Sequence, residues 1–503
     1  MDQASGLFKR FLSIFSAKVV TTIIAVISTP IIVRLLGPGG YGDYAVLLSI
    51  LTLYMIPISS AVTEGVQKFV AENREADDWS ERVIRYYTFL AVGLVLIGVV
   101  VLLIMTVLGL PAWVFGDEFT LYFFLLTAYV FVSQFRALGY HIILGFGLEP
   151  ISESLNVIRK LGTVTLGIAL VLLGFGVSGM IVGHIAANVL TVLIAFVVIF
   201  RRVNVRAILR GLPRSFPSTE LRSFNTLNVV LVLLLMSLFH IDVIMLRMIA
   251  GDETTGFYKA ALQFAEYLWI VPMALQLLLL HSSSALWSEN RDEEITRLAS
   301  RITRYSMLLV GLMAIGLAAL AHRIIPLYYG EPFAVSVVPL LILLPGTIGF
   351  ALARPLQAIS QGAGEIRTLI IATGTGAGVN LILNAVLIPQ YGMYGAAFAT
   401  SFSYAAMFGL YVWAAREIGF NPLEDFRPVR VAATILLSAP VIVLLDAAFT
   451  SDILALIVVP FAGTCVFVVL MLGTGAVDKS ECLSLLGKLP RVNGYVVRMK
   501  DSQ

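Results

Sequence analysis

Successive apolar stretches, each long enough to cross a bilayer, constrain this chain more than any other feature. A transmembrane helix needs about 20 mostly apolar residues, and a soluble core cannot absorb many such stretches. Hydrophobic residues make up 59% of the 503 residues and charged residues 13%, against about 25% charged residues in soluble domains. The sequence therefore predicts an all-α integral membrane protein.

The stretches predict about fourteen membrane helices, in two sets of six followed by a last pair. The first stretch is too long for a cleaved signal peptide, so we expect it to remain as a membrane anchor. The predicted spans are residues 11–36, 42–71, 84–109, 119–146, 155–175, 178–200, 223–249, 257–287, 304–325, 334–362, 367–388, 393–415, 430–449 and 453–474. The expected domains are an N-terminal lobe at 1–200, a basic cytoplasmic linker at 201–222, a C-terminal lobe at 223–415, accessory helices at 416–474 and a cytoplasmic tail at 475–503.

Basic residues predict the orientation of the chain. Most of the 34 lysines and arginines fall in alternate connections between spans, and Arg159 and Lys160 are placed in one of these. The opposite turns carry acids such as Asp117 and Glu331. By the positive-inside rule, both termini are expected in the cytoplasm and the chain in the cell membrane. A net charge of +3 is too small to indicate a nucleic-acid partner.

Short motifs recur at a nearly constant spacing, which predicts an internal duplication. Several weak matches in the same order favour a repeated six-helix unit. An even number of helices per unit makes the lobes parallel repeats that enclose a cavity. The clearest matches are Gly42-Asp-Tyr44 with Gly256-Phe-Tyr258, and Gly176-Val-Ser-Gly179 with Gly392-Met-Tyr-Gly395.

Residues 379–400, VNLILNAVLIPQYGMYGAAFAT, predict a hairpin between two membrane helices. Pro389 lacks a backbone N–H and Gly392 and Gly395 can supply a turn, so the first helix is expected to end near Ile388. The small residues that follow allow close packing of a second helix.

Asn380 and Asn384 share one face of that first helix, where they either join helices or touch a substrate. The pattern N-x-x-x-N followed by IP-x-YG-x-x-GAA-x-AT resembles the eleventh and twelfth helices of the Wzx-type oligosaccharide and polysaccharide flippases. These are relatives of the MATE transporters and of lipid II flippases. The segments RLLGPGGYGDYA and HIDVIML with TGFYKAALQF extend the resemblance.

The resemblance implies a MATE-like fold of two six-helix lobes that exports a lipid-linked glycan by alternating access. The glycan head would enter the cavity while the isoprenoid tail stays in membrane lipid. A glycan polymerase or glycosyltransferase machinery would be a further partner. Helix one carries Lys18 and no acid, unlike the drug exporters of the MATE type, and a cationic cavity suits an anionic lipid phosphate.

Basic residues inside the spans need water, a partner or the membrane edge, because a charge in hydrocarbon costs at least about 2.5 to 3.5 kcal/mol. Arg136 and Arg354 fall at equivalent positions of the two repeats, so both would face one cavity and bind phosphate or pyrophosphate. Pairing with acids inside the membrane is the alternative. The candidate substrate-binding set is Lys18, Arg34, Arg136, Arg247, Arg354, Asn380 and Asn384.

Three acids inside the spans, Glu64, Asp242 and Glu266, are candidates for a proton or sodium coupling site. A local ion pair of Glu64 with Lys68 is the alternative for the first acid, and a salt bridge to Arg247 or Lys259 for the second. Histidines inside helices serve either packing or proton relay. They are His141, His184, His240 and His281.

Motifs of known enzyme classes are missing from the sequence. It contains no nucleotide-binding loop, metal-spaced cluster or nucleophile elbow, and Cys465 and Cys482 imply no disulfide framework. We therefore expect no catalytic residues, metal or cofactor. The preferred hypothesis is a flippase of lipid-linked oligosaccharide. The alternatives are a proton- or sodium-coupled antiporter of small solutes and a non-transporting scaffold of a glycan-polymerising complex.

Overall fold

The computed structural model is mostly helical in the residues that it describes, which are 2–72, 74, 78–204, 211–213, 216–223, 226–289, 291–478 and 481. The chain forms two compact units, Met1–Ala260 with Ala377–Ala396 and Ala261–Gly376 with Ala397–Gln503. The expected tail beyond residue 481, including Cys482, lies outside the described residues.

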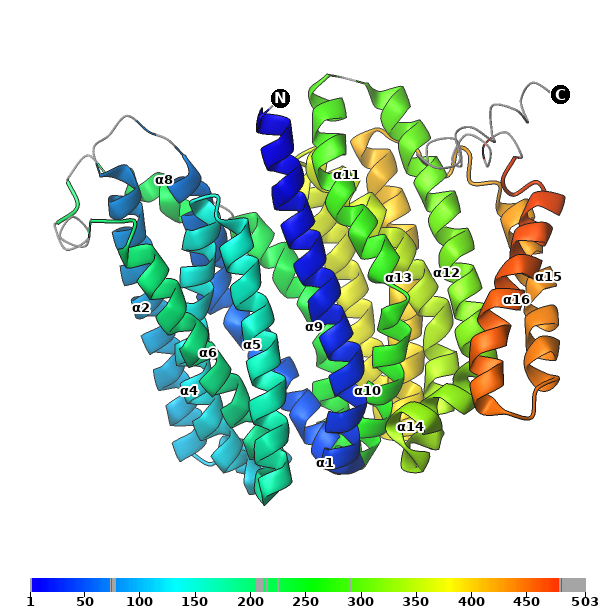
Figure 1. The fold of residues 1–503 in the computed structure, drawn as a ribbon, viewed down its shortest axis with the longest axis horizontal. Helices are drawn as coiled ribbons and strands as arrows, with labels where there is room; N and C mark the ends of the chain where they lie inside the picture. Colours follow the sequence, from blue (N-terminus) through cyan, green and yellow to red (C-terminus); the bar gives the residue numbers. More distant parts are fainter. Residues whose placement is uncertain are drawn as a thin grey trace. The chain divides into compact units, whose positions relative to one another are not determined.

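The first unit is built mainly from the N-terminal helices. Neighbouring helices α2, α4, α5 and α6 lie side by side (Figure 1). Its apolar core is formed by side chains of α1, α2 and α4, including several valines, Tyr87, Leu138 and Ile142. Its helices are α1 (Asp2–Ala71), α2 (Trp79–Val107), α3 (Leu110–Phe115), α4 (Glu118–Gly145), α5 (Glu149–Leu170), α6 (Gly176–Phe200), α8 (Ser218–Ser223), α9 (Thr226–Ala250) and the first part of α10 (Asp252–Tyr267), with a π-helical turn at Val171–Phe175.

The second unit packs a helical hairpin against one long helix. Leu308 and Leu320 on α12 lie in two apolar clusters whose other members come from α15, α16 and the segment that follows α16. Its helices are α11 (Ile270–Ser288), α12 (Asp292–Tyr329), α13 (Val337–Gly362), α15 (Pro428–Ala447), α16 (Asp452–Gly473) and most of α14 (Ile366–Ile418), with a 3₁₀ turn at Glu331–Ser336.

Eleven helices in the described ranges are long and apolar enough to cross a membrane. Three of these stretches have 52 to 56 residues, about twice the length that one crossing requires. Each of the three contains a break with non-helical backbone, at Gly37, Gly174 or Gly392. The chain is thus a multi-pass membrane protein, and the count of fourteen crossings stays a prediction.

Glycines at the predicted repeat positions share one backbone conformation. Gly176 has φ 52° and ψ −133°, and Gly392 has φ 53° and ψ −128°. Gly395, three residues after the second of these, approaches Leu387 so closely that a Cβ would lie 2.3 Å from its carbonyl oxygen. The hairpin predicted at 379–400 is therefore present. Its break falls at Gly392 rather than at Ile388, because Pro389 is accommodated inside the helix.

Candidate anion-binding site

One small cavity in the first unit is lined by polar residues from three neighbouring helices. Helix α4 contributes Arg136 and Tyr140, α5 contributes Asn156 and Arg159, and α6 contributes Thr191. Spacings of three and four residues bring the members of each pair onto the same side of their helix. Leu155 and Ala195 complete the wall.

The two arginines of this cavity have no carboxylate partner. Neither Arg136 nor Arg159 forms an ion pair with any described residue, and Nε of Arg159 is buried without a hydrogen bond. Glu153, on α5, accepts a hydrogen bond from Tyr140 Oη at 2.7 Å. Two cations thus face one space, where an anion would lower their mutual repulsion.

The cavity lies well inside the helices. Arg136 precedes the α4–α5 turn by about ten residues and Arg159 follows it by about as many, which places both about 15 Å along the helices from the turn. That is half of a hydrocarbon core about 30 Å thick. Arg159, which the charge pattern assigns to a cytoplasmic connection, lies within α5, which begins at Glu149.

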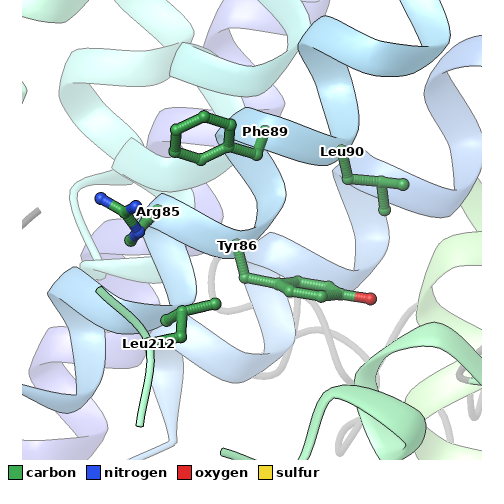
Figure 2. A pocket seen from close by; sticks show the side chains of 5 residues that line it. All are labelled: Arg85, Tyr86, Phe89, Leu90 and Leu212. Carbon is green, nitrogen blue, oxygen red and sulfur yellow. The ribbon is translucent and has the colours of Figure 1, made fainter. Parts of the chain in front are cut away.

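The cavity is narrow in this structure. Its volume is about 10 Å³, which is room for about one water molecule. A larger cavity of about 350 Å³ lies at the start of α2 and is lined by Arg85, Tyr86, Phe89, Leu90 and Leu212 (Figure 2). Its walls are mostly apolar and Arg85 lies over the Phe89 ring, 4.8 Å from its centroid, so this surface does not combine the polar groups found around Arg136.

Arg354 is buried in the second unit, on α13. Its Cζ lies 4.8 Å from the ring centroid of Trp269 and 5.0 Å from that of Phe350. Nη1 donates to Gln276 Oε1 at 3.3 Å, and the carboxylate of Glu266 attracts the guanidinium. Whether Arg354 and Arg136 share one phosphate stays a prediction.

Arg247 is engaged at the turn between the two halves of α1. Its Nε donates to Asp43 Oδ1 at 2.6 Å and its Nη2 donates to the Phe115 carbonyl at 2.9 Å. In this conformation the guanidinium therefore closes a contact between α9, α1 and α3. Arg34 and Lys18 lie on α1 with exposed side chains.

The candidate coupling acids have well-defined neighbours. Asp242 is buried and accepts hydrogen bonds from Tyr258 Oη and from the Val243 amide. Glu64 accepts from Asn228 Nδ2 at 3.0 and 3.1 Å. The alternative for Glu64, an ion pair with Lys68, is not observed, and Lys68 instead pairs with Glu72 one turn further along the helix.

The two asparagines of α14 bond to each other. Both are fully buried, and Asn384 Nδ2 donates to Asn380 Oδ1 at 3.0 Å. This geometry agrees with a packing role as well as with a polar lining. No group of three His, Cys, Asp or Glu side chains able to hold a metal occurs in the described part of the chain.

Residues 7–276, more than half of the chain, match the profile of the polysaccharide biosynthesis protein family. The chain belongs to this family. Residues 229–386 also match the MatE family. The chain is also similar to the probable low-salt glycan biosynthesis flippase Agl15 of Haloferax volcanii. The two are 22% identical over 74% of this chain and 75% of that protein.

Solved structures of this fold include transporters of two kinds. The lipid II flippase MurJ, in an inward closed conformation, superposes with a TM-score of 0.74 over 92% of this chain and 98% of its own, at 13% identity. An inward-facing MATE multidrug resistance transporter of the MOP superfamily superposes with a TM-score of 0.62 over 78% and 94%, at 16% identity. The expected MATE-like fold and the likeness to Wzx-type flippases are confirmed.

Proposed function

We propose that this protein is a flippase that moves a lipid-linked glycan from the cytoplasmic to the outer leaflet of the cell membrane by alternating access. The observation that carries the proposal is the pair Arg136 and Arg159 on one polar cavity inside a helical lobe. Among the described residues, neither guanidinium group has a carboxylate partner. Family membership and relatives named as a glycan flippase and a lipid II flippase support the same class.

The phosphate and the sugars of such a substrate would each meet suitable side chains on this cavity. The forked guanidinium groups suit phosphate oxygens, which accept paired hydrogen bonds from arginine. Tyr140, Asn156 and Thr191 offer hydroxyl and amide groups to sugar hydroxyls. The polyprenyl tail would remain in the lipid. Because the cavity has room for about one water molecule, binding requires the arginine side chains to turn or the helices to separate.

A transport assay in proteoliposomes tests the proposal. The double substitution of Arg136 and Arg159 by glutamine keeps the polar volume and removes both charges. We expect it to lower glycan-lipid translocation at least tenfold, since each charged hydrogen bond contributes about 1.5 to 3 kcal/mol. The matched control is Arg301→Gln, an exposed helical arginine of α12. Equal translocation by the double variant and the control would refute the phosphate role of the cavity.

The buried carboxylate of Asp242 favours a second candidate function, a proton- or sodium-coupled antiporter of small solutes. A carboxylate fully buried in a membrane helix is costly and is typical of ion pathways. Asp242→Asn keeps the size of the side chain and removes its charge. If that variant abolishes ion-driven uptake of a small cation into vesicles while Arg136→Gln leaves the uptake intact, the antiporter is favoured over the flippase.

A further inference from the structure

His184, on α6, lies between the hydroxyls of two tyrosines. Its Nε2 is 2.7 Å from Tyr44 Oη on α1, and its Nδ1 is 3.1 Å from Tyr129 Oη on α4. A neutral imidazole has one donor and one acceptor nitrogen, whereas an imidazolium has two donors. Because each hydroxyl can either donate or accept, the same positions of the heavy atoms satisfy both protonation states.

The other histidines of this unit have different partners. His141 Nδ1 lies 2.8 Å from Gln67 Oε1, an oxygen that can only accept. His240 Nδ1 lies 3.1 Å from Ser49 Oγ on α1. Among the described histidines of this unit, His184 is thus the one with a tyrosine hydroxyl beside each ring nitrogen, and both hydroxyls can adapt to the gain of a proton.

Two cations of one neighbouring helix interact with His184. Arg159 and Lys160 of α5 interact electrostatically with the imidazole, while α1 and α4 present hydroxyl groups to it. Tyr129 interacts in turn with Arg136 and Arg159. The imidazole and the arginine cavity therefore share the charge of Arg159.

We propose that His184 takes up a proton when an anion occupies the cavity of Arg136 and Arg159. The anion offsets the charge of Arg159 and so lowers that group's repulsion of a protonated imidazole. Coupling of this kind is reciprocal, so the proton strengthens anion binding by the same factor. The inference rests on the proposed function only in that the cavity must bind an anion.

The linkage is measured on the purified full chain by calorimetric titration with inorganic pyrophosphate. Titrations in two buffers of different ionisation enthalpy count the protons taken up per anion bound. Pyrophosphate's own protonation is common to all variants, so the difference between wild type and His184→Gln counts the proton on the imidazole. We expect that difference to be a net uptake by the wild type, and its affinity to rise at least about fivefold more than that of the variant from pH 8 to pH 6.

Three further variants separate the outcomes. His240→Gln is the matched control and keeps the wild-type uptake. Tyr129→Phe keeps the imidazole but removes one acceptor of its protonated form, and it lowers the uptake even if His184→Gln does not fold. The inference is overturned if the wild type and His184→Gln take up the same number of protons, or if His141→Gln loses the proton uptake instead. Either result leaves anion binding by the cavity intact. Absence of pyrophosphate binding by the wild type overturns both this inference and the phosphate site.

Discussion

Arg304 is a buried arginine whose charge is paired with two carboxylates and has a structural role. The side chain is fully buried on α12, where Nη1 donates to Asp425 at 3.0 Å and Nη2 to Glu481 at 2.9 Å. Arg136 and Arg159 have no such carboxylates in the described part of the chain. The presence or absence of an acid partner therefore separates structural arginines from candidate binding arginines.

Removal of the Arg304 charge should destabilise the protein. Arg304→Gln leaves Asp425 and Glu481 without their shared donor, and hydrogen bonds to charged groups contribute about 1.5 to 3 kcal/mol. We expect a clear fall in the melting temperature of the purified protein. Arg301→Gln, exposed one turn earlier, should leave it unchanged. An Arg304→Gln melting curve that superposes on the wild type would contradict the structural role.

Asp478 should make stability depend on pH at this same end of the second unit. A hydrogen bond from Arg427 Nη2 at 2.8 Å lowers the pKa of Asp478 below its usual 3.8. A carboxyl group whose pKa is lower in the folded state stabilises above its unfolded pKa, and this contribution is lost as the pH falls through the folded value. The melting temperatures of wild type and Asp478→Asn should differ at pH 7 and converge below pH 4. Glu253→Gln, an exposed acid, is the control and should show no such convergence.

At the scale of elements, the second half of α1 and the start of α10 approach each other closely. A Cβ on Gly42 would lie 2.1 Å from the Asp252 carbonyl oxygen, and a Cβ on Gly256 would lie 2.0 Å from that of Pro38. The ion pair of Arg247 with Asp43 joins the same region. The sequence matched these two glycines only as members of a repeated motif. It could not predict that the two motifs touch, because a local motif does not specify tertiary neighbours.

A methyl group at Gly256 should push the start of α10 away from α1. Overpacking of a tight contact costs about 1 to 3 kcal/mol, so Gly256→Ala should lower thermal stability and weaken the closure around Asp43. Gly316→Ala on α12 is the matched control, since no heavy atom lies within 4 Å of its Cβ and alanine favours helix there. Equal melting temperatures for the two variants would show that α1 and α10 can move apart without loss of stability.

At the scale of the whole molecule, the sequence predicts a repeat and one of the two arginines of the candidate anion site. Gly116 and Gly330, which are 214 residues apart, have φ 111° with ψ 162° and φ 106° with ψ 159°. Such matching turn conformations are expected if the predicted duplication is correct. Arg136 was found because it lies deep in a predicted span. Arg159 falls inside the predicted span 155–175, but the charge pattern assigned it to a connection. Its place on the cavity depends on how α4, α5 and α6 pack together, which a sequence pattern does not specify.

Duplication also predicts that Arg136 and Arg354 hold one phosphate, and a double-mutant cycle tests it. Each single glutamine substitution should lower glycan-lipid translocation about tenfold, the lower end for loss of a charged hydrogen bond. If both groups contact the same phosphate, the double variant should lose far less than the hundredfold that independent sites would give, because effects at a shared site do not add. Arg354 lies over Trp269 and Phe350, so Arg354→Lys tests whether charge alone suffices. A fully multiplicative loss, with pyrophosphate affinity unaffected by Arg354→Gln, would place Arg354 outside the phosphate site.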